Sequence, residues 1–174
     1  MYVIGIDPGK TSGAYCLITE QGIVLEREPM PEMFMLCDRL EQIKAEALRS
    51  ERELHCYLEK AQTMPKQGGV SVFRYGQHYG NLEGILLSLQ IRHTVVHPST
   101  WTRVMHAGCS VKEKGRSGAK KRSFEAAQRL FPGESFLATE RSSKPHDGII
   151  DAMLIAEYGR RQIKHGPTNT EPES

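Results

Sequence analysis

Long apolar runs are absent from this chain of 174 residues. Its longest apolar stretches have the length of a strand and fall well short of the roughly 18 residues that a membrane-spanning helix needs. The first residues also lack the basic segment with which a signal peptide begins. We therefore predict a soluble intracellular protein with no membrane partner.

Cysteine is scarce and unsuitably spaced for metal or disulfide chemistry. The four cysteines are far apart in the sequence and form no C-x-x-C pair. This spacing argues against a zinc knuckle and against a disulfide framework. We interpret all four as small buried side chains, namely Cys16, Cys37, Cys56 and Cys109.

Charge of one sign is also lacking overall, since 23 Lys and Arg face 21 Asp and Glu, which gives a net charge of +2. The basic residues are nevertheless concentrated. Residues 103–122 hold seven cations against the single acid Glu113, so this segment alone carries a charge of +6. Such a cluster is typical of a surface that binds nucleic-acid phosphates, and the alternative is an ordinary solvated basic face.

The order of apolar patterns predicts an α/β domain that covers residues 1–163. Short apolar runs at 2–6, 13–18 and 23–25 indicate three strands in a meander, and runs at 54–58 and 94–97 indicate two more. Helical spacing occurs at 32–49, 71–90, 117–131 and 147–163, and a short helix is expected after Pro98. Residues 164–174 are polar, and we predict a disordered tail there.

Acidic residues occupy places where apolar segments end. Asp7 follows the first predicted strand, Glu59 follows the strand at 54–58, and Asp147 and Asp151 lie one turn apart on one face of the last helix. Like charges beside apolar neighbours destabilise a helix unless a cation neutralises them. Carboxylate oxygens suit Mg²⁺ or Mn²⁺, and four of them can hold two ions for phosphoryl displacement.

Each acid also has an ordinary structural interpretation. Asp7 precedes Pro-Gly and fits a turn, Glu59 can pair with Lys60 on the surface, and Asp147 can cap the last helix. The joint occurrence of strand-end acids and a separate basic segment favours the catalytic interpretation.

Three segments in order resemble the acidic motifs of RuvC-type Holliday junction resolvases. They read GIDPGKTSG at 5–13, YLEK at 57–60 with GQ at 76–77, and HDGIIDA at 146–152. MPKQG at 64–68, P-x-x-W at 98–101 and KK-x-S at 120–123 before LFP at 130–132 look more like the phage and organellar branch. The resemblance covers about residues 1–158.

This resemblance implies a ribonuclease H-like fold, with a mixed five-stranded sheet flanked by helices. It implies a homodimer that resolves four-way DNA junctions by paired symmetric nicks and leaves 5′-phosphate and 3′-hydroxyl ends. Two Mg²⁺ ions per active site are implied, with Mn²⁺ as a substitute. The location would be the cytoplasm of a bacterial or phage-infected cell, or an organellar matrix.

The resemblance also assigns metal-binding and catalytic roles to Asp7, Glu59, Asp147 and Asp151. Bacterial relatives place their last two acids three residues apart, and Gly148 stands at that place here. We therefore move the role to Asp147, with His146 as a weaker catalytic candidate. Where the bacterial family inserts an aromatic wedge into the junction, residues 62–64 read Gln-Thr-Met.

The predicted DNA-binding residues surround these acids. We expect Lys120 and Lys121 to contact the scissile phosphate region from the start of a helix, and residues 112–116 to form a mobile arm that orders on DNA. The full predicted set is Lys66, Gln67, Arg74, Lys112, Lys114, Arg116, Lys120, Lys121 and Arg122. Helix 71–90, with glycines at 76, 80 and 84, is predicted to form the dimer interface, and core packing is the alternative.

Two other functions compete with junction resolution. A ribonuclease H-like nuclease that cuts flaps or forks would carry the same acids. A silent junction-binding module is less consistent with the sequence, because carboxylates do not favour phosphate binding. Sugar kinases and actin-like ATPases also begin with an Asp-x-Gly-x-Thr turn, but they need two such domains and a longer chain.

Overall fold

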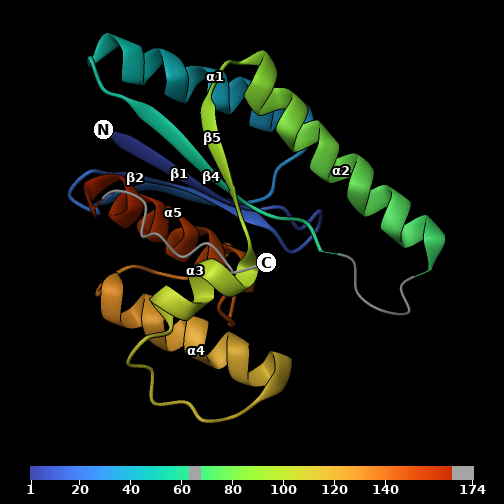
Figure 1. Ribbon diagram of the computed structural model, residues 1–174, viewed down its shortest axis with the longest axis vertical. Helices are drawn as coiled ribbons and strands as arrows, with labels where there is room; N and C mark the ends of the chain where they lie inside the picture. The colour runs from blue at the N-terminus through green and yellow to red at the C-terminus, as the bar shows by residue number, and fades with distance from the viewer. Residues whose placement is uncertain (63–67, 166–174) are drawn as a thin grey trace, which may run out of the picture.

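The computed structural model describes residues 1–62 and 68–165, and a five-stranded sheet forms its centre (Figure 1). The strand order is β3-β2-β1-β4-β5. Strands β1 (Tyr2–Asp7), β2 (Ala14–Thr19) and β3 (Val24–Pro29) are antiparallel neighbours, whereas β4 (Leu54–Glu59) and β5 (Arg92–Val96) run parallel to β1. The predicted mixed five-stranded sheet is confirmed.

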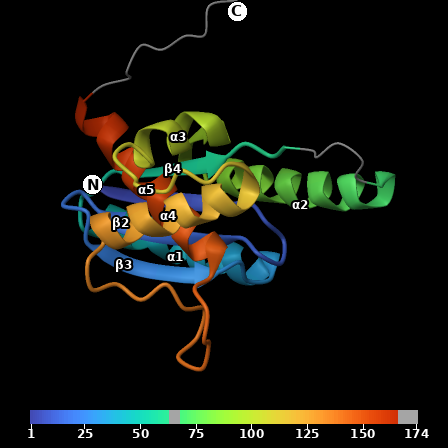
Figure 2. The ribbon, with the colours of Figure 1, turned by 90° about the horizontal axis from the view of Figure 1, so that it is seen from below.

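Helices cover both faces of this sheet. Helices α1 (Met33–Arg49) and α2 (Gly69–Ser88) lie on one face, and α3 (Pro98–Met105), α4 (Gly115–Leu130) and α5 (Asp147–His165) lie on the other (Figure 1). Seen from below, α2 projects beyond the sheet at its N-terminal end (Figure 2). None of the helices in the described parts is long and apolar enough to cross a membrane.

Alternation along β1 divides the core into two layers. Val3 packs with the α5 layer, whereas Ile4 and Ile6 pack with the α1 and α2 layer. Such alternation follows from the two-residue period of a strand. Gly5 lets α5 approach the sheet, because a Cβ there would lie 2.2 Å from the carbonyl oxygen of Ala152. Helix α5 is therefore held directly against the strand that ends at Asp7.

Several predicted boundaries and properties change. Helix α4 begins at Gly115, so Arg116 is helical rather than part of a mobile arm, and Lys120 and Lys121 lie in its second turn rather than at its start. Helix α5 continues to His165 and takes in the first residues of the predicted tail. The rest of that tail, residues 166–174, lies outside the described residues.

The cysteine prediction is half correct. All four cysteines are free, and Cys16 and Cys56 are buried in the sheet. Cys37, in α1, and Cys109, in the segment before α4, are only partly buried.

Candidate active site

Asp7 and Glu59 end neighbouring parallel strands. Ile6 of β1 is paired with Leu58 of β4, so the two acids follow at the same edge of the sheet. Asp7 shares its face with Val3, and Glu59 shares its face with Tyr57, which both belong to the α5 layer. Both carboxylates therefore meet the N-terminal end of α5.

Helix α5 supplies the other two acids. Asp147 is its first residue, and Asp151 follows one turn later on the same face. Gly148 lies between them against the β1–β2 loop, where a Cβ would come within 2.0 Å of the carbonyl oxygen of Ser12. No side chain fits at this position, so a carboxylate there is sterically excluded and Asp147 is the nearest acid that α5 can offer.

The acids raise one another's pKa. Burial raises the pKa of Asp7 to about 7, and the charges of Glu59 and Asp147 add to this effect. Burial followed by the charge of Asp151 raises the pKa of Glu59 to about 7. Asp151 also reaches about 7 through burial and the charges of Asp7 and Asp147. The four carboxylates thus form one electrostatically coupled cluster.

Side chains from α3 and α4 fix two of these carboxylates. Trp101 donates a hydrogen bond from Nε1 to Oε2 of Glu59 at 2.6 Å. Ser123 hydrogen-bonds Asp151, and Nε2 of His106 lies 3.0 Å from the Ser123 hydroxyl oxygen. The rings of Trp101 and His106 meet edge to face with centroids 6.0 Å apart. One connected group therefore supports Glu59 and Asp151 from behind.

Sequence reasoning did not assign these supporting roles. Trp101 and Ser123 stand in the segments that resemble the phage and organellar branch, but neither spacing nor residue type indicated which acid each would contact. Tyr75 is a further residue near the acids that the sequence analysis did not single out. Burial and the nearby charges of Asp7 and Glu59 raise the pKa of Tyr75, which places its ring beside the acids.

Asp147 and His146 have other partners in this structure. Asp147 is half exposed and forms an ion pair with Lys120. His146 accepts a hydrogen bond at Nδ1 from the backbone N–H of Ile149 at 3.2 Å, and so caps the start of α5. The capping role that the sequence suggested for Asp147 therefore belongs to the side chain of His146.

The carboxylate oxygens of these acids are ligands that suit a hard divalent cation, although the side chains do not stand close enough together to form a complete metal site. Within residues 1–62 and 68–165, no group of three or more His, Cys, Asp or Glu side chains is placed to hold a metal ion. Oδ1 of Asp151 is buried and has no hydrogen-bond partner among the same residues. A buried, unpaired carboxylate oxygen among like charges is a suitable ligand for Mg²⁺ or Mn²⁺.

An open cleft of about 860 Å³ adjoins Asp7. Its walls are the β1–β2 loop, the first turns of α2 and the start of α4. Arg74 and Arg116, both predicted to bind DNA, line this cleft together with Tyr75. Asp7 therefore borders a space with cations on two sides, which suits an extended anionic substrate.

The other predicted DNA-binding residues lie elsewhere. Lys112 and Lys114 are exposed in the segment before α4. Lys121 pairs with the carboxylate of Glu113, and Arg122 donates to the carbonyl oxygen of the same residue. Lys66 and Gln67 lie outside the described residues.

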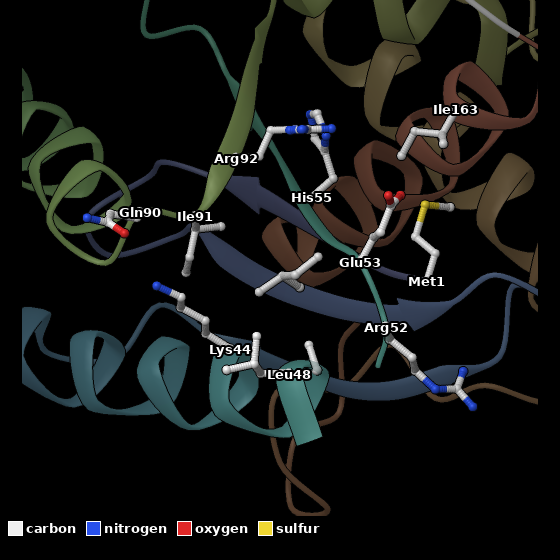
Figure 3. A pocket seen from close by; sticks show the side chains of 12 residues that line it. Met1, Lys44, Leu48, Arg52, Glu53, His55, Gln90, Ile91, Arg92 and Ile163 are labelled. Atoms are coloured by element: carbon white, nitrogen blue, oxygen red, sulfur yellow. The ribbon is translucent and has the colours of Figure 1, made fainter. Parts of the chain in front are cut away.

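A second hollow, of about 440 Å³, lies at the opposite ends of the same strands (Figure 3). Met1, Leu48 and Ile91 line it beside charged residues such as Lys44 and Arg92. Lys44 donates a hydrogen bond to the carbonyl oxygen of Leu89 at 2.6 Å and closes one side. None of the coupled acids reaches this hollow, so it is separate from the candidate active site.

Comparisons with known proteins reveal similarity at the level of structure. No family model and no curated protein matches the sequence. A structure of Thermus thermophilus RuvC in complex with a Holliday junction substrate matches with a TM-score of 0.57 and 15% identity, over 95% of this chain and 97% of that chain. This chain has the ribonuclease H-like fold of RuvC. A second Thermus thermophilus RuvC structure matches with the same TM-score, 17% identity and the same coverage of both chains.

The RuvC-like fold accounts for the position of the cluster. In open α/β sheets, ligands bind beyond the carboxyl ends of parallel strands, where the order of the strands changes. Here β1 lies between its antiparallel neighbour β2 and its parallel neighbour β4, and Asp7 and Glu59 stand at that edge.

Proposed function

We propose that this protein is a metal-dependent endodeoxyribonuclease that resolves four-way DNA junctions by paired symmetric nicks. The observation that carries the proposal is the convergence of Asp7, Glu59 and Asp151 at one sheet edge, where the pKa of each is raised to about 7. The adjoining cleft, lined by Arg74 and Arg116, supports a DNA substrate. The RuvC fold, seen elsewhere with a Holliday junction, supports the choice of a four-way junction.

The carboxylates of Asp7, Glu59, Asp147 and Asp151 would hold two Mg²⁺ ions, for which Mn²⁺ can substitute. Bound ions of this kind activate water and stabilise the leaving oxygen in phosphodiester hydrolysis. The products would carry 5′-phosphate and 3′-hydroxyl ends. Trp101 orients Glu59, and Ser123 orients Asp151, because each holds one carboxylate oxygen by a hydrogen bond. The other oxygen of each acid is then free to act as a metal ligand.

Lys120 would exchange partners when the ions and DNA bind. Its ammonium group pairs with Asp147 in the structure, and both side chains are about half exposed. An ion pair at this exposure is weak and readily replaced. Release of Lys120 would free Asp147 as a ligand and leave a cation beside the scissile phosphate.

Paired nicks require two active sites, so we include a homodimer through α2 in the proposal. The glycines at 76, 80 and 84 have open space beside them, and Phe73 and Leu87 are 71% and 66% exposed. A shallow hollow of about 420 Å³ lies between α1 and α2 beside Gly80 and Gly84. Sedimentation analysis should give a dimer for the protein and a monomer for Gly84→Arg; a monomeric wild-type protein would contradict this part.

The cleavage assay uses a labelled synthetic four-way junction with Mg²⁺, alongside matched linear duplex and flap substrates. We expect paired nicks on the junction, loss of cleavage but not of binding in Asp7→Asn, and unchanged cleavage in the control Asp38→Asn, which alters an exposed acid of α1. Equal or better cleavage of flaps would identify a general branch nuclease. Binding without cleavage in Mg²⁺ or Mn²⁺ would refute the catalytic role of the acids.

A further inference from the structure

A polar cavity of about 260 Å³ lies beside the catalytic cleft. It is bounded by Lys10 of the β1–β2 loop, by the corner between β3 and α1, and by one face of α2. The α2 face presents Arg74, Gln77, His78 and Asn81, whose spacing brings them onto one side of a helix. Most of these side chains are hydrogen-bond donors, so the cavity is suited to an acceptor.

The N-terminus of α1 opens onto this cavity. Residues 31–33 line the cavity wall, and this 17-residue helix begins at the last of them, Met33. Glu32 at the N-cap makes no side-chain capping bond, and the first turn contains no acidic residue. The first N–H groups of a helix lack intrahelical acceptors and carry the positive end of the helix dipole. An anion in the cavity would satisfy both features.

His78 provides a second and independent observation. Its side chain lines the cavity and is 7% exposed, yet Nε2 has no hydrogen-bond partner in the described part of the chain. A buried polar atom without a partner is costly, so such an atom requires an explanation. A ligand that accepts a hydrogen bond in the cavity would supply the partner that the protein does not.

The same cations border the cavity and the catalytic cleft. Lys10 and Arg74 line both spaces, and the cleft also contains Asp7. Neither cation forms an ion pair with any residue in ranges 1–62 and 68–165. Glu32 is the one acid on the cavity wall, so the two cations outnumber it. A strand that leaves the cleft next to Asp7 would therefore follow these cations into the cavity.

We propose that this cavity binds a non-scissile phosphate of the DNA strand that occupies the catalytic cleft. This inference rests on the proposed nuclease function. A phosphate contact fixes the position of a nucleic acid without reading its sequence. Bound between the N-terminus of α1, Lys10, Arg74 and His78, the phosphate sets the register of the strand, and so determines which phosphodiester faces the four acids.

Nuclear magnetic resonance titration tests the site with two probes, inorganic phosphate and a 5′-phosphorylated dinucleotide. We expect saturable shifts of the backbone amides of residues 33–35 and of the His78 ring, with the dinucleotide binding more tightly than phosphate. Chloride at matched ionic strength should not reproduce them. Absence of these shifts, or equal shifts with chloride, would overturn the site. Tighter binding of free phosphate would overturn its assignment to DNA.

Two variants with matched controls locate the effect. Asn81→Leu fills the cavity from an exposed position on α2 and should weaken dinucleotide binding about tenfold, whereas Gln128→Leu, which alters an exposed amide of α4 away from the cavity, should not. Glu32→Gln removes the opposing charge and should tighten binding about threefold, whereas Glu46→Gln on the same helix should not. Unchanged affinity in both Asn81→Leu and Glu32→Gln would refute the inference.

The junction experiment separates this inference from the proposed function. Binding is measured without divalent metal, and cleavage by the wild-type protein is measured in parallel. In Arg74→Gln, the slope of log affinity against log salt should fall by about one, because one phosphate contact is lost. If the wild-type protein cleaves the junction, and Asn81→Leu and Arg74→Gln both bind it with wild-type affinity, the phosphate site is refuted and the nuclease function is not. Phosphate binding in a protein that cuts no branched DNA would refute the nuclease function alone.

Discussion

Helix α5 carries two acids with buried oxygens in opposite electrostatic settings. Asp151, near its N-terminal end, lies among other carboxylates, and burial and these neighbours raise its pKa to about 7. Glu157, farther along the helix, is 4% exposed. Arg160 and Arg161 hold its two oxygens at 2.6 Å and 2.8 Å and keep its pKa below the usual value despite burial.

This contrast distinguishes a structural acid from a functional one. Glu157 receives its compensating charge from its own helix, so its burial needs nothing from outside the chain. Asp151 receives a hydrogen bond from Ser123, but its neighbours Asp7 and Asp147 add negative charge rather than remove it. A buried acid with perturbed pKa and like-charged neighbours at a cleft is typical of a functional site.

The largest expected effect is on cleavage by Asp151→Asn. The amide keeps the size of the carboxylate but lacks the charge that holds a metal ion, so we expect single-turnover cleavage of a four-way junction to fall by about 1000-fold. Glu157→Gln is the matched control on the same helix and should cleave at the wild-type rate. A similar loss of cleavage in Asp151→Asn and Glu157→Gln would show that both acids support folding and that neither has a specific role in catalysis.

A smaller effect is expected from Trp101→Phe, which removes the hydrogen bond to Glu59 and keeps most of the buried ring. Loss of a group that orients a metal ligand typically weakens metal binding by about 10–100-fold. Calorimetric titration of the protein with Mn²⁺, without DNA, measures this directly. Unchanged Mn²⁺ affinity, with an unchanged melting temperature, would mean that Trp101 only fills space.

Ser123 supplies the corresponding test for Asp151. Ser123→Ala loses the hydroxyl and should weaken Mn²⁺ binding, whereas Ser123→Thr keeps the hydroxyl and should bind Mn²⁺ more tightly than Ser123→Ala does. If both variants fold and both bind Mn²⁺ weakly, the hydroxyl of Ser123 is not what supports Mn²⁺ binding.

The sequence was sufficient to predict the sheet, and the positions of the four acids along the strands and the last helix also follow from local patterns. Asp7 and Glu59 follow apolar strands, and the spacing of Asp147 and Asp151 places them on one helix face. Asp7 and Glu59 meet because two parallel strands end at one edge, and the ribonuclease H-like topology brings the start of α5 with Asp147 and Asp151 to the same edge. Local pattern and topology agree at this edge, so the placement was predictable.

The supporting contacts were not predictable, because they depend on how separate helices pack. Trp101 reaches Glu59 across 42 residues of sequence, and Lys120 reaches Asp147 across 27. The steric reason for Gly148 is also nonlocal, since the carbonyl oxygen of Ser12 excludes a side chain there. One-dimensional spacing contains no information on such contacts.

The fourth prediction addresses the structural side of the comparison. Glu157→Gln removes the charge-assisted hydrogen bonds that the buried Glu157 accepts from Arg160 and Arg161, so we expect it to lower the free energy of unfolding by roughly 1.5 kcal/mol. Urea denaturation in the presence of a chelator measures this value. Asp151→Asn removes a like-charge conflict and should not be destabilising under the same conditions. Equal destabilisation of both variants would contradict the distinction between the two acids.

The smallest effect is a dependence of the melting temperature on pH in the metal-free protein. The pKa values of Asp7, Glu59 and Asp151 are raised to about 7, so the folded protein holds their protons more tightly than the unfolded chain. Their contribution to stability is complete below the unfolded pKa of about 4 and is lost as pH rises through about 7. Glu157 has the opposite sign, because its pKa is lowered: its contribution is present above its ordinary pKa and is lost on acidification.

Mn²⁺ separates the two contributions, since a bound cation favours the ionised acids of the cluster and does not involve Glu157. We expect the difference in melting temperature with and without Mn²⁺ to grow by a few degrees, about 3 °C, between pH 5 and pH 8. Asp151→Asn should reduce this growth, and Glu157→Gln should preserve it. If the Mn²⁺-induced change in melting temperature stays constant with pH, ionisation of the four acids is not linked to metal binding. The difference in pKa between Asp151 and Glu157 would then have no connection with function.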